Sequence, residues 1–91
     1  MNNPITAHEL VCGELNDLYA RKHADYGNSF HRTFVEEGMA VARIRLSDKL
    51  NRFKTLTRSQ GDERRVDDET IRDTLLDLAN YAIMTIMEID G

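Results

Sequence analysis

The segment ETIRDTLLDLANYAIM (69–84) decides the fold of this 91-residue chain. Its apolar residues recur every three or four positions, which is the period of an α-helix. Together with the apolar residues that follow, they form two adjacent stripes: Ile71, Leu75, Leu78, Ala82, Ile86 and Ile89 in one, and Leu76, Ala79, Ile83 and Met87 in the other. Their arc is wider than the roughly 100° of an ordinary surface helix. We therefore predict a helix over residues 68–89 that needs neighbours on more than one side.

Two further helices are predicted, over residues 7–23 and 39–56. The earlier one is expected to begin with a capping box, in which Thr6 and Glu9 each bond the other residue's backbone N–H. In the later one, apolar side chains share a face: Met39, Ala42, Leu46, Leu50 and Phe53. The sequence thus predicts an all-α protein with three main helices.

The segments between these helices differ in character. Gly27 stands among turn formers and is expected to adopt a positive φ. Phe30 and Phe34 are expected to form a short helical turn that closes one end of the bundle, and Gly38 is expected to mark a break before the next helix. Residues 58–67 carry no apolar pattern, so we expect a charged, solvated loop there.

The composition supports this fold class and bounds its size. One proline, five glycines and 7% aromatic residues are typical of helices rather than of a turn-rich sandwich or barrel. A domain of 91 residues has a limited capacity to bury a core, and three helices cannot surround the wide apolar arc of residues 68–89. We therefore expect a single domain over residues 1–91, whose helical bundle is completed in a dimer or a tetramer.

Charge and hydropathy exclude several kinds of partner. The net charge of −4 gives no reason to expect direct nucleic-acid binding, which usually requires a basic surface. No apolar run approaches the roughly 20 residues of a membrane span, and the opening MNNPITAHEL lacks the basic and apolar parts of a secretory signal. Cys12 is expected to be a buried or half-buried thiol in a reducing compartment. These features predict a cytoplasmic protein without a membrane partner.

An acidic stripe, defined by Glu69, Asp73, Asp77 and Asn80, runs beside the apolar arc. Asp73 and Asp77 lie one turn apart, so both carboxylates could hold Mg²⁺, which prefers oxygen ligands. For Glu69, an equally good alternative to metal binding is a favourable interaction with the helix dipole, because it lies in the first turn. Alternatively, the stripe is a solvated helix edge with salt bridges across the bundle. The surroundings of Asp77 are evidence against a merely solvated edge, because its sequence neighbours are nearly all apolar. A carboxylate is rarely placed among apolar residues unless it is paired, hydrogen-bonded or bound to a metal.

A basic stripe, defined by Arg45, Asp48, Lys49 and Arg52, lies on the helix over residues 39–56. Arginine offers phosphate oxygens a bidentate fork, and lysine offers them a point charge. Asp48 either pairs with Arg52 one turn later or joins the metal site. The alternative is an intrahelical network of surface charges. A basic stripe beside an acidic one indicates nucleotide chemistry, because the first suits phosphates and the second suits a metal ion.

A third set of polar residues precedes the glycine turn: Lys22, Asp25 and Tyr26. The tyrosine could stack on a base or hydrogen-bond a sugar, or it could close the bundle with its hydroxyl satisfied locally. The three histidines lack the spacing of metal ligands and are expected on the surface: His8, His23 and His31.

Three ordered motifs resemble a family of small phage and bacterial proteins called a nucleotide-modification-associated domain. They are K-x-x-D-Y-G-x-S-F from Lys22, R-x-S-D-K-x-x-R from Arg45 and E-x-x-x-D-T-x-x-D-L-A-N-Y from Glu69, and the match covers residues 20–84. That family looks like a relative of the all-α MazG-like and dimeric dUTPase pyrophosphohydrolases. In those enzymes, facing helices supply four acidic residues that bind Mg²⁺, and a nucleoside triphosphate is cleaved to monophosphate and pyrophosphate.

Carried over residue by residue, the resemblance implies a metal site and a substrate site. The implied metal ligands are Asp48, Glu69, Asp73 and Asp77, and the catalytic residues among them are Asp48, Asp73 and Asp77. The implied substrate-binding residues are Lys22, Asp25, Tyr26, Arg45, Lys49, Arg52 and Asn80.

The acidic set departs from the pattern of the enzymes. They carry Glu-x-x-Glu on one helix and Glu-x-x-Asp on another, whereas Glu69 and Asp73 stand four residues apart here. The preceding helix contributes only Asp48, unless Glu36 and Glu37 reach the site. Two functions therefore remain open: a Mg²⁺-dependent nucleotide-binding protein that hydrolyses a nucleoside triphosphate, and a non-catalytic accessory protein. In the second, the stripes would form a structural ion-pair network, with Asp73 and Asp77 against Arg45 and Arg52.

Overall fold

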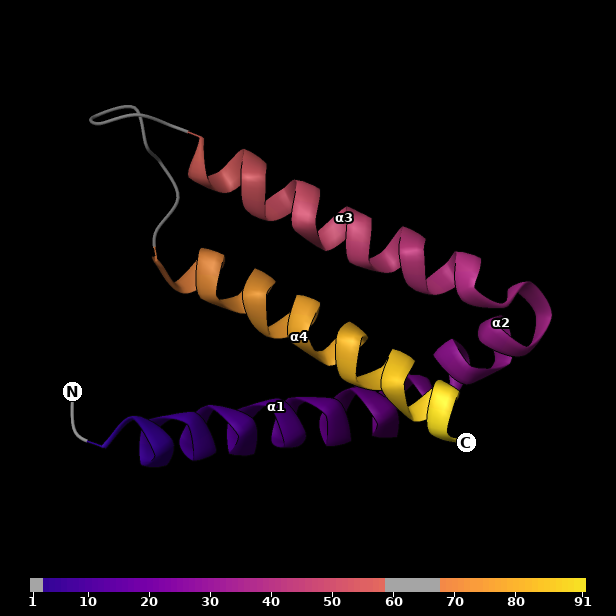
Figure 1. Ribbon diagram of the computed structural model, residues 1–91, viewed down its shortest axis with the longest axis horizontal. Coiled ribbons are helices and arrows are strands. Elements are labelled where there is room, and N and C mark those ends of the chain that lie inside the picture. Colours follow the sequence, from indigo (N-terminus) through magenta and orange to yellow (C-terminus); the bar gives the residue numbers. More distant parts are fainter. Residues whose placement is uncertain (1–2, 59–67) are drawn as a thin grey trace.

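The computed structural model describes residues 3–58 and 68–91, and these form four α-helices without a strand (Figure 1). The helices are α1 (Pro4–Tyr26), α2 (Ser29–Glu37), α3 (Met39–Thr57) and α4 (Asp68–Asp90). The prediction of an all-α protein is confirmed, and α3 and α4 end within one residue of the predicted bounds. The expected short turn around Phe30 is instead the helix α2, so the predicted three helices become four. Apart from Arg58, the predicted charged loop lies outside the described residues.

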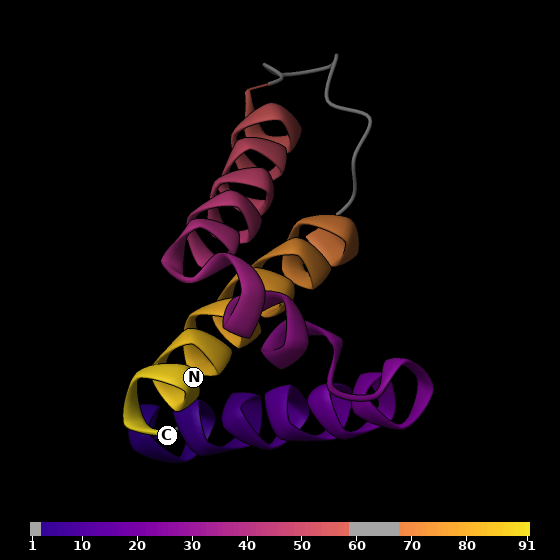
Figure 2. The ribbon, with the colours of Figure 1, turned by 90° about the vertical axis from the view of Figure 1, so that its right-hand side faces the viewer.

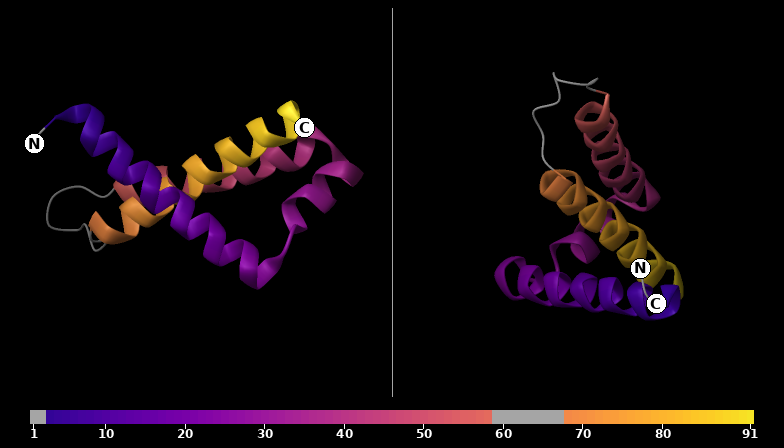
Figure 3. Two further views of the ribbon diagram at one scale, coloured as in Figure 1. Left: turned by 90° about the horizontal axis from the view of Figure 1, so that it is seen from below. Right: turned by 90° about the vertical axis from the view of Figure 1, so that its left-hand side faces the viewer.

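α3 and α4 run antiparallel, lie side by side and form the largest contact between helices (Figure 1). α1 lies across α4 at a steep angle, as the view from below shows (Figure 3). α2 connects α1 with α3 at one end of the molecule and packs against both α3 and α4 (Figure 2). None of the described helices is long and apolar enough to cross a membrane.

The predicted bounds of α1 are wrong at both ends. The helix begins at Pro4 because Asn3 caps it: its Oδ1 accepts a hydrogen bond of 2.8 Å from the backbone N–H of Ile5. Proline suits the first helical position since its fixed φ is helical and its missing N–H would have no partner there. Thr6 therefore lies inside the helix and caps nothing. α1 continues to Tyr26 because Gly27 is the first residue to leave the helical region, with the predicted positive φ, 64°.

The buried core of the single chain is small. Only Leu15, Val41 and Ala42 are buried apolar residues in the described part of the chain, and no large side chain there is fully buried. Two polar residues of α4 join them, Thr74 and Asn80. Cys12 is exposed, contrary to the expected buried thiol. The residue of α1 that is buried is Leu15, nearly one turn farther along the helix.

Asn80 connects α4 to α1, and we expect Asn80→Asp to lower the free energy of unfolding by about 1–3 kcal/mol. The Nδ2 of Asn80 donates to the backbone oxygen of Leu15 at 3.2 Å, and the side chain is 8% exposed. The substitution keeps the shape but places a carboxylate against a carbonyl oxygen. Urea unfolding followed by circular dichroism measures the change. Asn51→Asp, at an exposed position of α3, is the control, and an equal loss in both variants would contradict this role.

Candidate functional site

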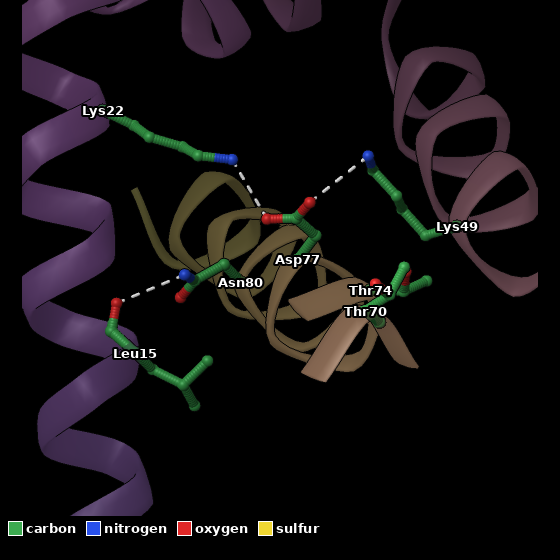
Figure 4. A network of polar contacts seen from close by, with 7 residues as sticks. All are labelled: Leu15, Lys22, Lys49, Thr70, Thr74, Asp77 and Asn80. Atoms are coloured by element: carbon green, nitrogen blue, oxygen red, sulfur yellow. Dashed lines mark hydrogen bonds and ion pairs between the residues drawn. The ribbon is translucent and has the colours of Figure 1, made fainter. Parts of the chain in front are cut away.

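Asp77 of α4 lies between two lysines from helices that are far apart in the sequence (Figure 4). The Nζ of Lys22, from α1, is 3.0 Å from Oδ1, and the Nζ of Lys49, from α3, is 3.4 Å from Oδ2. Both carboxylate oxygens therefore have a cationic partner. Two ammonium groups against one carboxylate leave a net charge of +1 at a half-buried position, which favours an anionic ligand.

An open pocket of about 240 Å³ lies beside this ion-pair triad, between the end of α1, the start of α2 and the middle of α4. We call it the first pocket. Two aromatic pairs contribute to its wall, Tyr19 with His23 and Phe30 with Tyr81, each with ring centroids 5.8 Å apart. The complete lining is Tyr19, Lys22, His23, Tyr26, Gly27, Asn28, Ser29, Phe30, Asp77, Asn80, Tyr81 and Met84. A mainly aromatic and apolar wall with a few polar groups is typical of a small-molecule site.

The structure brings together part of the predicted substrate site. Lys22, Tyr26 and Asn80 line the first pocket, and Lys49 reaches Asp77 from the other side. Arg45 lines a second, smaller pocket of about 140 Å³ that adjoins the first. The two remaining predicted residues are exposed and line neither pocket: Asp25 and Arg52.

The predicted metal ligands are not gathered in the single chain. Within residues 3–58 and 68–91, no three His, Cys, Asp or Glu side chains lie close enough together to hold a metal ion. Asp77 stands at the pocket, whereas the three other predicted ligands are exposed elsewhere on α3 and α4: Asp48, Glu69 and Asp73. The protein groups present at the pocket thus offer a cation one carboxylate, and the magnesium site stays a prediction.

The expected ion-pair network is formed with different partners. The accessory-protein alternative placed Asp77 against Arg45 and Arg52, but the cations that reach it are the two lysines. The positions of the two lysines explain why they, and not the arginines, pair with Asp77. Lys49 faces Asp77 across the antiparallel α3–α4 contact, and Lys22 approaches from α1, which crosses α4 at this level (Figure 4).

Sequence reasoning missed a second ion pair between α1 and α4. Arg72 donates two hydrogen bonds to Glu14, one of 2.8 Å from Nη1 to Oε2 and another from Nη2 to Oε1. These hydrogen bonds hold the pKa of Glu14 below its usual range. The pair therefore adds stability above the ordinary carboxyl pKa, and this contribution is lost as the pH falls through the lowered one. No local pattern signals such a pair, because its members are 58 residues apart.

Sequence reasoning also missed much of the aromatic wall of the first pocket. Each of these aromatic residues stands at helical spacing from apolar residues of its own helix, which is also the pattern of core positions: Tyr19 in α1, Phe30 in α2 and Tyr81 in α4. Only their convergence at one end of the molecule distinguishes them. His23 lines the same wall, and all three histidines are exposed, as predicted.

Fold and pocket together define a small all-helical protein with an aromatic-lined pocket beside an ion-pair triad. Residues 22–89 match the family model described as nucleotide modification associated domain 1, and the chain therefore belongs to this family. The predicted resemblance to this family is confirmed. The matched region contains both lysines, Asp77 and every residue of the first pocket except Tyr19. No curated protein and no solved structure matches the chain.

Proposed function

We propose that the protein binds a nucleotide, with the nucleoside in the first pocket and a phosphate at Lys22 and Lys49. The observation that carries this proposal is the convergence of two lysines, from α1 and α3, beside an aromatic-lined pocket. Family membership supports a connection with nucleotides.

The two parts of the pocket suit the two parts of a nucleotide. A base stacked on an aromatic side chain gains about 1–3 kcal/mol, and the first pocket offers several aromatic rings. A phosphate oxygen would take the place of Asp77 as the partner of the ammonium groups. Lys22 is half-exposed and lines the pocket, so a ligand can reach it without a change of fold.

Mg²⁺ suits this site as a companion of bound phosphates, since it commonly uses one or two carboxylates together with waters and phosphate oxygens. Asp77 would supply the carboxylate, and Asp48, Glu69 and Asp73 are the further candidates on the two stripes. When bound, the ion would neutralise phosphate charge and activate a water molecule. We extend the proposal to hydrolysis of a nucleoside triphosphate to monophosphate and pyrophosphate, the reaction that the MazG-like resemblance implies.

The proposal is tested by the melting temperature of the protein with nucleoside mono-, di- and triphosphates, each with and without Mg²⁺. A ligand that binds only the native state raises the melting temperature by mass action. We expect at least one nucleotide to raise it, with a larger rise when Mg²⁺ is present. Ligands that raise it are then assayed for release of pyrophosphate. No rise with any combination would refute nucleotide binding.

The pairing of Asp77 with Lys49 also favours a second candidate, the non-catalytic accessory protein. In that case the triad is a structural network that connects α1, α3 and α4. A double-mutant cycle between Lys49 and Asp77 would then give a coupling energy in unfolding experiments, while no nucleotide would bind. Coupling together with nucleotide binding would instead assign both roles to the same residues.

We also propose that the protein assembles with copies of itself through α4. Five large apolar residues on one side of this helix are between 42% and 64% exposed: Leu75, Ile83, Ile86, Met87 and Ile89. Their exposure fits the prediction that the helix needs more neighbours than one chain provides. Burial of this stripe against a second copy would remove apolar surface from water and enlarge the small core.

Ile86→Glu is expected to convert the assembly to monomers, because it places a charge near the middle of this stripe, where Ile86 is 55% exposed in the single chain. Light scattering coupled to size-exclusion chromatography measures the mass. Thr55→Glu, at an exposed position of α3, is the control and should leave the mass unchanged. A wild-type protein that is monomeric at all concentrations would contradict the proposal.

A further inference from the structure

We infer that the second pocket is an oxyanion subsite, in which Arg45 recognises a phosphate beyond the one held by the lysines. The inference rests on the proposed function and deepens it, because it makes Arg45 the residue that distinguishes nucleotides by their number of phosphates. The second pocket is lined by Ser29, Phe30, Thr33, Val41, Arg45 and Tyr81.

The two pockets adjoin each other. Ser29, Phe30 and Tyr81 line both of them. Neither pocket alone, at about 240 and 140 Å³, reaches the range of about 300–1,000 Å³ that is typical of ligand sites. The two together do. The inference places a single ligand across both pockets, past the three residues that they share.

The register of α3 against α4 places Arg45 next to the ion-pair triad. Lys49 contacts Asp77, and the two helices run antiparallel. Arg45 stands one turn before Lys49, and Tyr81 stands one turn after Asp77, so Arg45 and Tyr81 meet at the second pocket. One helical turn is about 5.4 Å, a separation that long arginine and lysine side chains can span. A chain of phosphates that begins at the lysines therefore leads toward Arg45.

The chemistry of the second pocket suits an oxyanion better than a base. No carboxylate lines it, in contrast to the first pocket with Asp77. In the described part of the chain, no carboxylate forms an ion pair with Arg45. The guanidinium is charged at every physiological pH and matches phosphate geometry with its fork of N–H donors. Thr33 donates its hydroxyl proton to the backbone oxygen of Ser29. The side-chain donors that remain in the lining are the guanidinium of Arg45 and the hydroxyls of Ser29 and Tyr81.

Calorimetric titration with adenosine and thymidine mono-, di- and triphosphates, in EDTA so that no metal contributes, tests the inference. The wild-type protein is expected to bind the di- and triphosphates more tightly than the monophosphate of the same nucleoside. Arg45→Met should weaken di- and triphosphate binding by about tenfold and change monophosphate binding by less than about twofold. Arg43→Met removes the same charge from an exposed position of α3 that lines neither pocket, and it should behave like the wild type.

Three results would overturn the subsite while leaving the proposed function intact. They are equal wild-type affinity for all three phosphate lengths, an equal loss for all three in Arg45→Met, and a change in base preference without a change in phosphate preference. Absence of wild-type binding to every nucleotide, with and without Mg²⁺, would instead reject the proposed function, and the subsite with it. If Arg45→Met fails to fold, Arg45→Lys tests the subsite instead. Lysine keeps the charge without the fork of donors, so this variant should retain only part of the gain in affinity that the second phosphate gives the wild type.

Discussion

Lys49→Met is expected to weaken nucleotide binding by at least about tenfold, and Lys22→Met by a smaller factor. A hydrogen bond to a charged group contributes about 1.5–3 kcal/mol, and about 1.4 kcal/mol corresponds to a factor of ten in affinity. The side chain of Lys49 is 29% exposed and that of Lys22 is 52% exposed, so water screens the second charge more strongly. Calorimetric titration with the nucleotide that raises the melting temperature most measures both changes.

The matched control for these variants is Lys54→Met. Lys54 lies in the last turn of α3, is exposed and lines neither pocket, so its removal changes the net charge by the same amount without touching the site. We expect its affinity to differ from wild type by less than about twofold, as is common for an exposed charge. A loss as large as that of Lys49→Met would mean that overall charge, and not the triad, attracts the nucleotide.

Asp77→Asn is expected to have two opposite effects. Without a divalent cation it should raise nucleotide affinity about two- to fivefold, because the carboxylate no longer competes with phosphate for the lysines. It should also lower the stability of the free protein by about 1 kcal/mol, or roughly 4–8 °C in melting temperature, since both ammonium groups lose their counter-ion. Titration in EDTA and thermal unfolding without ligand measure the two effects.

The same variant distinguishes the possible roles of Asp77. If the carboxylate also serves bound Mg²⁺, the gain in melting temperature that Mg²⁺ adds to nucleotide binding should disappear in Asp77→Asn. Asp73→Asn, one turn earlier on α4, tests whether the exposed part of the acidic stripe contributes to the same effect. Lower nucleotide affinity in EDTA for Asp77→Asn would contradict competition between Asp77 and phosphate.

Local rules were sufficient for most of the helices. The apolar period predicts α3 and α4 closely, and the two glycines that end α1 and α2 adopt a positive φ, 64° at Gly27 and 67° at Gly38. The prediction failed where two local signals compete. At the start of α1, the cap by Asn3 and the proline after it prevail over the capping box of Thr6. The turn at Phe30 continues into a helix as far as the next glycine.

The candidate site was predictable only in part. The motifs predict Lys22, Asp77 and Asn80 as site residues, and all three line the first pocket. Their partners could not be predicted, because helical spacing relates residues three or four positions apart, whereas Lys22 and Asp77 are 55 apart. The choice of lysines over arginines at Asp77 depends on where α1 crosses α4 and on the register of α3.

The sequence by itself determined the fold class, the positions of the long helices, the breaks at the glycines and the family. These follow from apolar periodicity, from backbone freedom at glycine and from ordered motifs, all of which act over short stretches of chain. The tertiary structure decided which charges meet and where the pockets lie. Coulomb attraction and side-chain packing act through distance in space, and the packing of α1 and α3 against α4 sets the distances from Asp77 to the two lysines.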